Sequence, residues 1–372
     1  MQIPELLKEA DEAFQNDDVP GAMEFLKDAG LLGERNAALD YAYYAMHASP
    51  KLTVEYLNQV PGAKEQVVTY HRLLISYFSK VNTRFREIAD SLISLGKDGN
   101  VQALLTILAY LPTFHVHFNT VGSWLSKISP NIFSQLNIAT FYIDNADSSS
   151  ETEIAEFLEN ALSCINHPSE IIETSLPIIE FKGVLSPFEC MYLRARFETL
   201  LKPSMVVDPV SGQGRYDPIR TSYVAAITAD LSDWLIRKID LMIAYHSNTK
   251  PNQGEYLNLL RYAPGQEYKG HFDAISVKQD YAIYQDGAQR IKTALVYLNS
   301  VEDGGRTLFP RLDLSVKPVQ GNMVIFDNID AEGRVRPLSF HAGESTISSH
   351  KWLLTKWIRE EPTSYGKLVH GI

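Results

Sequence analysis

The chain has 372 residues, 45% hydrophobic and 21% charged, which is the composition of an ordinary globular protein rather than of a disordered or fibrous one. Its formal net charge of -11 argues against nucleic acid or an anionic membrane surface as the main partner, because either would repel it. The length exceeds the usual size of one domain and therefore favours two.

Two features of the sequence favour a cytoplasmic protein. Cys164 and Cys190 are the only cysteines, too few for a disulfide framework or a thiolate metal site, and they suit a reducing compartment. The first residues lack the basic and apolar segments of a secretory signal, and no apolar stretch reaches transmembrane length. We therefore expect a cytoplasmic protein that is neither exported nor bound to a membrane.

Residues 1–169 are predicted to form an all-helical domain. Apolar residues recur at helical spacing, as in Leu6, Leu7 and Ala10. Turn signals divide the segment into pieces of ordinary helix length: Asp17-Asp18, Gly30, Ser49-Pro50, Pro61-Gly62, Gly96 to Gly99 and Ser129-Pro130. Since no single repeat period holds throughout, we predict either a tetratricopeptide-like solenoid or an irregular bundle, serving substrate presentation or dimerisation.

A second domain, of mixed helix and strand, is predicted for residues 170–372, which makes the whole chain α+β. Ser186-Pro187-Phe188-Glu189 has the N-cap, proline and acidic first turn of a helix. Short β-rich segments with glycine and proline between them favour a barrel or a double-sheet jelly roll: Pro177 to Phe181, Tyr256 to Tyr262, Thr293 to Leu298, Met323 to Phe326 and Trp352 to Ile358.

Three residues in this domain have the pattern of a metal site. His271 and Asp273 are two positions apart on a segment predicted to be extended, so their side chains point to the same face. His341, much later in the chain, can complete the set from another strand. Two imidazoles and one carboxylate leave three coordination positions open, as in iron(II) oxygenases, whereas a structural zinc site wants four protein ligands. The His-x-Asp spacing by itself is a weak signal.

Lys351 strengthens this interpretation. It begins the apolar segment Trp352-Leu353-Leu354, so we predict a buried lysine that needs an anionic partner. An oxo-acid that chelates the metal at one end needs a cation at its far carboxylate. A lysine makes only a point-charge contact there, and hydroxyl donors are expected to assist it, with Tyr262 and Thr293 as candidates.

Further motifs surround these residues in a fixed order. They are Phe181 to Cys190, Arg220-Thr221-Ser222, Leu260 to Tyr268, Ala294 to Asn299, Glu302 to Pro310, Lys317-Pro318, Gly321-Asn322, His341-Ala342-Gly343, Lys351-Trp352 and Lys356-Trp357. Together they resemble the prolyl 4-hydroxylase family of 2-oxoglutarate oxygenases over about residues 177–360.

The resemblance implies a double-stranded β-helix fold with a site assigned residue by residue. Iron(II) would be held by His271, Asp273 and His341, and the C5 carboxylate of 2-oxoglutarate by Lys351, with Tyr262 and Thr293 assisting. Tyr268 and Trp357 match positions that face the substrate or cosubstrate pocket. It further implies dioxygen as oxidant, ascorbate as reductant, and succinate and carbon dioxide as products. The related halogenases lack the carboxylate ligand, so Asp273 favours hydroxylation.

The sequence departs from the family in two places near the site. His350 stands where a small or acidic residue is usual, and Glu344-Ser345-Thr346 replaces the common Cys-Pro-Val after His-Ala-Gly. Neither change touches a ligand position, so both concern the substrate rim. The export signals and cysteines of the collagen-type members are missing, which makes collagen an unexpected substrate.

The expected reaction is hydroxylation of an aliphatic C–H of a free amino acid or a peptidyl residue, with proline favoured. Two alternatives stay open: a peptide-binding hydroxylase whose helical domain forms a substrate groove lined by Tyr41, Tyr43 and Tyr44, and a catalytically idle regulatory protein. A tyrosine stripe is more often part of a core.

The remaining charged candidates and histidines have more common structural interpretations. We interpret Glu255, Arg220 and Arg261 as members of structural ion pairs, which is the more frequent role of such residues. We interpret His115, His117, His246 and His370 as packing or surface residues.

Overall fold

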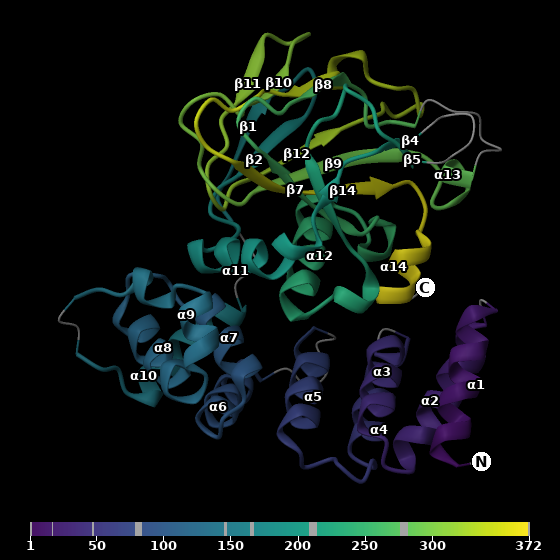
Figure 1. The fold of residues 1–372 in the computed structure, drawn as a ribbon, viewed down its shortest axis with the longest axis vertical. Helices are drawn as coiled ribbons and strands as arrows, with labels where there is room; N and C mark the ends of the chain where they lie inside the picture. Colours follow the sequence, from purple (N-terminus) through teal and green to yellow (C-terminus); the bar gives the residue numbers. More distant parts are fainter. Residues whose placement is uncertain are drawn as a thin grey trace. The chain divides into compact units, whose positions relative to one another are not determined.

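The chain divides into two compact units, residues 1–164 with 368–372, and residues 165–367 (Figure 1). The computed structural model describes residues 2–16, 18–46, 48–78, 84–144, 147–163, 167–207, 214–275 and 282–370. Cys164 lies outside these ranges, whereas Cys190 is a buried free thiol. None of the helices in these ranges combines the length and the apolar character needed to cross a membrane.

Within its described residues the first unit consists of helices and the turns that join them. From α1 to α9 each helix packs against the next along the chain, and α10 returns to pack on α6 and α7. The helices are α1 (Ile3–Gln15), α2 (Val19–Leu31), α3 (Arg35–Ala45), α4 (Pro50–Leu57), α5 (Gln66–Phe78), α6 (Phe85–Lys97), α7 (Val101–Tyr110), α8 (Val116–Ile128), α9 (Pro130–Gln135), the 3-10 helix η1 (Ile138–Phe141) and α10 (Glu151–Ser163).

The break predicted at Gly30 lies slightly later in the structure, because α2 continues through this residue and ends at Leu31. A Cβ atom at Gly30 would lie 2.1 Å from the hydroxyl oxygen of Tyr56 and 2.8 Å from Ala38. The glycine therefore permits a close contact between helices, and the chain turns at Gly33, whose φ is +106°.

The three tyrosines considered for a substrate groove are half-buried and contact other rings of the helical unit. The ring centroid of Tyr41 lies 4.6 Å from that of Tyr56, and Tyr44 lies 5.8 Å from Phe14. Tyr41 also packs against the apolar clusters formed around Ala38 and Ala37. Tyr41 and Tyr44 thus contribute to packing, as tyrosines at helical spacing usually do.

The second unit is rich in antiparallel strands, which confirms a helical region followed by a sheet-rich domain. Among the described residues, one sheet has the order β1-β2-β12-β9-β14-β7-β6-β3, a second has the order β11-β10-β13-β8, and β4 pairs with β5. The large sheet contains β1 (Ser169–Glu173), β2 (Ile178–Phe181), β3 (Lys202–Pro203), β6 (Tyr223–Ile227), β7 (Leu257–Tyr262), β9 (Arg290–Tyr297), β12 (Met323–Asp327) and β14 (Lys351–Arg359). The small sheet contains β8 (Tyr268–His271), β10 (Thr307–Phe309), β11 (Leu314–Val316) and β13 (His341–Gly343). The separate two-stranded pair consists of β4 (Val206–Val207) and β5 (Gly214–Arg215).

Helices accompany the sheets. They are α11 (Pro187–Phe197), α12 (Trp234–Ser247), α13 (Ala282–Gln285) and α14 (Ser364–His370). The predicted start of α11 is confirmed: Ser186 accepts a hydrogen bond from the Glu189 backbone, and Glu189 accepts one from the Ser186 backbone. This reciprocal pair satisfies two amide groups that a helix end would otherwise leave open.

Strand β14 separates the interior of the unit from α12. Lys351, Leu353, Thr355 and Trp357 line a cavity that also receives residues of the small sheet. On the opposite face Lys356 pairs with Asp240 of α12 at 2.6 Å, with both side chains buried. Because successive strand residues face opposite sides, one strand serves both layers, and Figure 1 shows α12 and the small-sheet strands on opposite sides of β14.

Candidate active site

The three predicted metal ligands converge in the structure. Strands β8 and β13 are paired so that His271 lies opposite His341, and the chain then bends to bring in Asp273. Asp273 follows the end of β8, which is a small departure from the predicted continuous strand. One ligand atom from each residue lies within 4.8 Å of the others, and within the described ranges no other group of histidine, cysteine and acidic residues is so arranged.

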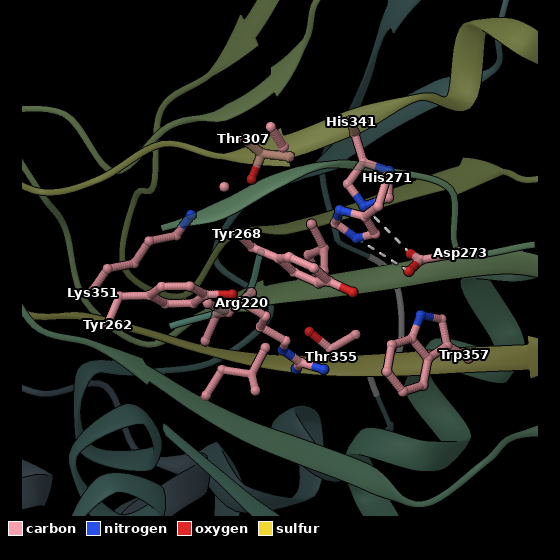
Figure 2. A pocket seen from close by; sticks show the side chains of 15 residues that line it. Arg220, Tyr262, Tyr268, His271, Asp273, Thr307, His341, Lys351, Thr355 and Trp357 are labelled. Atoms are coloured by element: carbon pink, nitrogen blue, oxygen red, sulfur yellow. Dashed lines mark ion pairs between the residues drawn. The ribbon is translucent and has the colours of Figure 1, made fainter. Parts of the chain in front are cut away.

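Both imidazoles are oriented by the backbone. Nδ1 of His271 lies 2.8 Å from the Lys269 carbonyl oxygen, and Nδ1 of His341 lies 2.9 Å from that of Ser339. A carbonyl only accepts hydrogen bonds, so each Nδ1 carries the proton and each Nε2 is left with its lone pair. The Nε2 atoms lie 3.6 and 3.5 Å from the Asp273 carboxylate oxygens, as the dashed lines in Figure 2 show.

The environment favours the protonation states that a metal needs. Burial lowers the pKa of His341 to about 4, which keeps this imidazole neutral at physiological pH. Burial by itself would raise the pKa of Asp273, but the adjacent His341 and His271 rings outweigh it and hold that pKa below its usual range. A neutral imidazole and an ionised carboxylate are the ligand forms of these side chains.

This donor set fits iron(II). Two imidazole nitrogens and one carboxylate on one side of an ion leave three positions free for other ligands. The site is also nearly closed to solvent, since Asp273 and His341 are 6% and 5% exposed. Such burial excludes water from a reactive centre.

Lys351 lies in the same cavity as the triad. It is only 2% exposed, and the structure records no hydrogen bond or ion pair for its ammonium within the described part of the chain. The Nζ atom lies 5.7 Å from the ring centroids of Tyr262 and Tyr297. Burial lowers the pKa of Lys351 to about 7, with Glu344 as the opposing charge. A buried cation without a bonded partner fits the far carboxylate of an oxo-diacid.

Thr293 is not placed beside Lys351, contrary to the prediction. It lies opposite Trp357 in the pairing of β9 with β14, and Lys351 is six residues further along β14, or about 20 Å of strand. The Thr293 hydroxyl instead donates a hydrogen bond to Oδ2 of Asp273 at 2.7 Å. It is therefore a contact of the carboxylate ligand rather than of the cosubstrate.

Thr307 is the hydroxyl that sequence reasoning missed. It lies on β10, lines the cavity, and shares a 2.8 Å hydrogen bond with the hydroxyl of Tyr297. Figure 2 shows the Thr307 and Lys351 side chains at the same end of the cavity. The only sequence signal was its place two residues before Phe309 in the motif Glu302 to Pro310, which does not distinguish it from other threonines.

The other predicted pocket residues line the cavity wall. Tyr262, Tyr268 and Trp357 all contribute to it. The Tyr268 ring stacks on His271 with centroids 3.6 Å apart, and the Arg220 guanidinium lies 4.8 Å from the Tyr268 centroid. Arg220 is thus a cavity residue, and no ion pair of it is recorded in the described chain.

The remaining charged candidates have structural partners. Glu255 pairs with Arg290 at 2.7 Å, and Arg261 approaches Glu198 at 3.4 Å. The ion-pair interpretation is therefore confirmed for Glu255 and Arg261.

Two of the remaining histidines also have structural roles. His115 caps α8 by accepting a hydrogen bond from the His117 backbone. His246 lies 3.1 Å from His167 between ring nitrogens and packs against the Phe181 ring, which agrees with the predicted packing position.

Comparison with known proteins agrees with the geometry. The sequence profile of the 2OG-Fe(II) oxygenase superfamily matches residues 257–359. Prolyl 4-hydroxylase 1 of Arabidopsis thaliana is 35% identical over 213 residues, covering 54% of this chain and 74% of the relative. Probable prolyl 4-hydroxylase 10 of the same plant is 29% identical, covering 63% of this chain and 93% of the relative.

Among solved structures, viral collagen prolyl hydroxylase from Paramecium bursaria Chlorella virus-1, in its 2-oxoglutarate complex, is 27% identical. It covers 49% of this chain and 95% of its own, with a TM-score of 0.39. The sequence relatives decide the assignment, since more than two thirds of a protein 35% identical to this chain is matched. The chain belongs to the prolyl 4-hydroxylase family of 2-oxoglutarate oxygenases, and it is a dioxygenase that uses iron(II), 2-oxoglutarate and dioxygen.

Proposed function

We propose that this enzyme hydroxylates a prolyl residue within a peptide. The observation that carries the proposal is the shared cavity, which has the His271, Asp273 and His341 ligand set at one end and the buried Lys351 at the other. A keto-diacid can bridge these two ends by chelation and by a charge-assisted contact. The peptide is favoured over a free amino acid because the relatives are prolyl 4-hydroxylases by name.

The residues of the chain have distinct parts in this proposal. Lys351 would bind the far carboxylate, with the Thr307 hydroxyl and Tyr262 beside it. Tyr268 and Trp357 would shape the wall along which the substrate lies, so that one C–H bond is fixed near the metal. When bound, iron(II) and 2-oxoglutarate supply the oxidising chemistry, with succinate and carbon dioxide as products.

We further propose that the two sheets of the catalytic unit form a double-stranded β-helix. In support, residues of the small-sheet strands β8, β10 and β13 and of the large-sheet strands β7, β9 and β14 meet across one cavity. An enclosing pair of sheets is the arrangement in which jelly rolls hold ligands. An experimental structure in which these sheets do not face each other would contradict the assignment.

The proposed reaction is tested by product analysis. The enzyme is incubated with iron(II), 2-oxoglutarate and either proline-containing peptides, matched peptides with alanine for proline, or free amino acids. We expect succinate and a +16 mass on proline for the first set alone. A +16 product confined to free amino acids would overturn the peptide assignment, and no substrate-stimulated succinate with any set would overturn hydroxylation of both classes.

Binding of 2-oxoglutarate is expected to weaken above pH 7. In the free enzyme the pKa of Lys351 is about 7, so above this pH the amine is neutral and must take up a proton to pair with the carboxylate. The Kd, measured anaerobically on metal-loaded enzyme, should rise by up to about tenfold per pH unit. In Lys351→Arg the side chain stays charged, so this pH dependence should disappear. A wild-type Kd that is constant from pH 7 to 9 would contradict the prediction.

A further inference from the structure

A buried chain of hydrogen bonds ends on the carboxylate ligand. Asn328, directly after β12, donates from Nδ2 to the Thr293 hydroxyl oxygen at 2.9 Å, and Thr293 donates to Oδ2 of Asp273 at 2.7 Å. Thr293 and Asn328 are both 0% exposed. The pairing of Phe326 with Thr293 between β12 and β9 brings the two side chains together.

The direction of this chain is fixed by its donors. The amide nitrogen of Asn328 can only donate, so the Thr293 oxygen must accept from it. An ionised carboxylate can only accept, so the single Thr293 proton must point at Asp273. The hydroxyl has no rotational freedom left, and one oxygen of Asp273 therefore always receives a hydrogen bond.

Asn328 also holds an unsatisfied group that folding by itself does not explain. Its Oδ1 atom is buried and finds no hydrogen-bond partner within the part of the chain that the structure describes. An apolar side chain of similar size would avoid this desolvation cost. The hydrogen bond from Nδ2 to Thr293 accounts for the presence of an amide side chain at this position.

We propose that Thr293 and Asn328 are positioning residues that hold Asp273 as a one-oxygen ligand. With Oδ2 occupied by Thr293, Oδ1 is the oxygen offered to the ion, and three positions stay open for other ligands. If the hydrogen bond is lost, the carboxylate is free to rotate and to bind through both oxygens, which takes one of those positions. Hydrogen bonds to a metal ligand from residues that do not themselves bind the metal orient that ligand and change the affinity for the metal.

Manganese(II), a stand-in for iron(II) that gives an EPR signal, tests the proposal without turnover. Binding is titrated by the EPR signal of the free ion, and bound water is counted from line broadening in oxygen-17-enriched water. We expect Thr293→Val to raise the manganese Kd by roughly 10–100-fold and to lower the number of bound waters by one. Thr293→Ser restores the hydroxyl and should restore both values. Asn328→Leu, which leaves Thr293 free to rotate, should change them in the same direction as Thr293→Val.

Thr363→Val is the matched control. Thr363 is also buried in this unit, donates to the Gly254 carbonyl at 2.7 Å and accepts from the Gly366 backbone at 2.8 Å. The Thr363→Val substitution should lower the melting temperature and leave manganese binding unchanged.

The proposal would be overturned if Thr293→Val kept the wild-type manganese affinity and number of bound waters. It would also be overturned if Thr363→Val lost as much manganese affinity as Thr293→Val. If Thr293→Val does not fold, Asn328→Leu decides by the same criteria. Failure of the wild type to bind manganese would reject the metal site itself.

Discussion

Replacing His271 with alanine is expected to abolish both metal binding and turnover. His271 supplies one of three ligand atoms that lie within 4.8 Å of one another, and the described residues offer no other cluster that can replace it. Loss of an outer contact to a metal ligand already costs about 10–100-fold in affinity, so loss of the ligand itself should exceed that range. The measurements are anaerobic calorimetry with iron(II) and succinate formation in the presence of substrate.

The matched control is His350→Ala. His350 is an exposed histidine of the same unit that lies outside the ligand set. Its substitution should leave the affinity for iron(II) unchanged. Substantial turnover by the His271→Ala enzyme would show that the iron is held elsewhere.

Replacing Lys351 with methionine should remove most of the affinity for 2-oxoglutarate and spare the metal. Methionine keeps much of the length and apolar contact of the lysine stem, so the change removes mainly the charge. Breaking a buried charge pair costs about 3–5 kcal/mol, which corresponds to a Kd about 10² to 4 × 10³-fold higher. Calorimetry under nitrogen measures both affinities on the same protein.

Lys356→Met provides a control on the same strand. Lys356 is as buried as Lys351, but it faces α12 and pairs with Asp240. Its loss should destabilise the fold, because it removes the buried ammonium that pairs with Asp240, without changing the affinity for 2-oxoglutarate. Equal cosubstrate affinity in wild type and Lys351→Met would mean that the far carboxylate binds elsewhere.

Local sequence patterns predicted the positions of helices and strands in this protein. The helix after Ser186 depends on one capping residue and the acidic residue three positions later, and both contacts are present. The strand predicted for 352–358 is confirmed within β14, and that for 323–326 within β12. At Gly30 the same reasoning placed the helix end slightly too early, because a glycine needed for a close helix contact has the same sequence appearance as one that ends a helix.

By itself the sequence determined the family and the identity of the residues that meet at the site. The spacing of His271 and Asp273, the later His341 and a lysine at the head of an apolar strand are local features that chemistry can interpret. Their ligand atoms and Lys351 share one cavity in the structure.

Only the tertiary structure decided which threonine hydroxyl lies beside Asp273 and which lies near Lys351. Thr293 and Thr307 both lie on strands of the sheet-rich unit, but strand register places the first on Asp273 and the second at the Lys351 end. Register depends on pairings between segments far apart in the chain. A shift of one residue would turn Thr293 to the opposite face of its sheet, away from Asp273, without altering any local pattern.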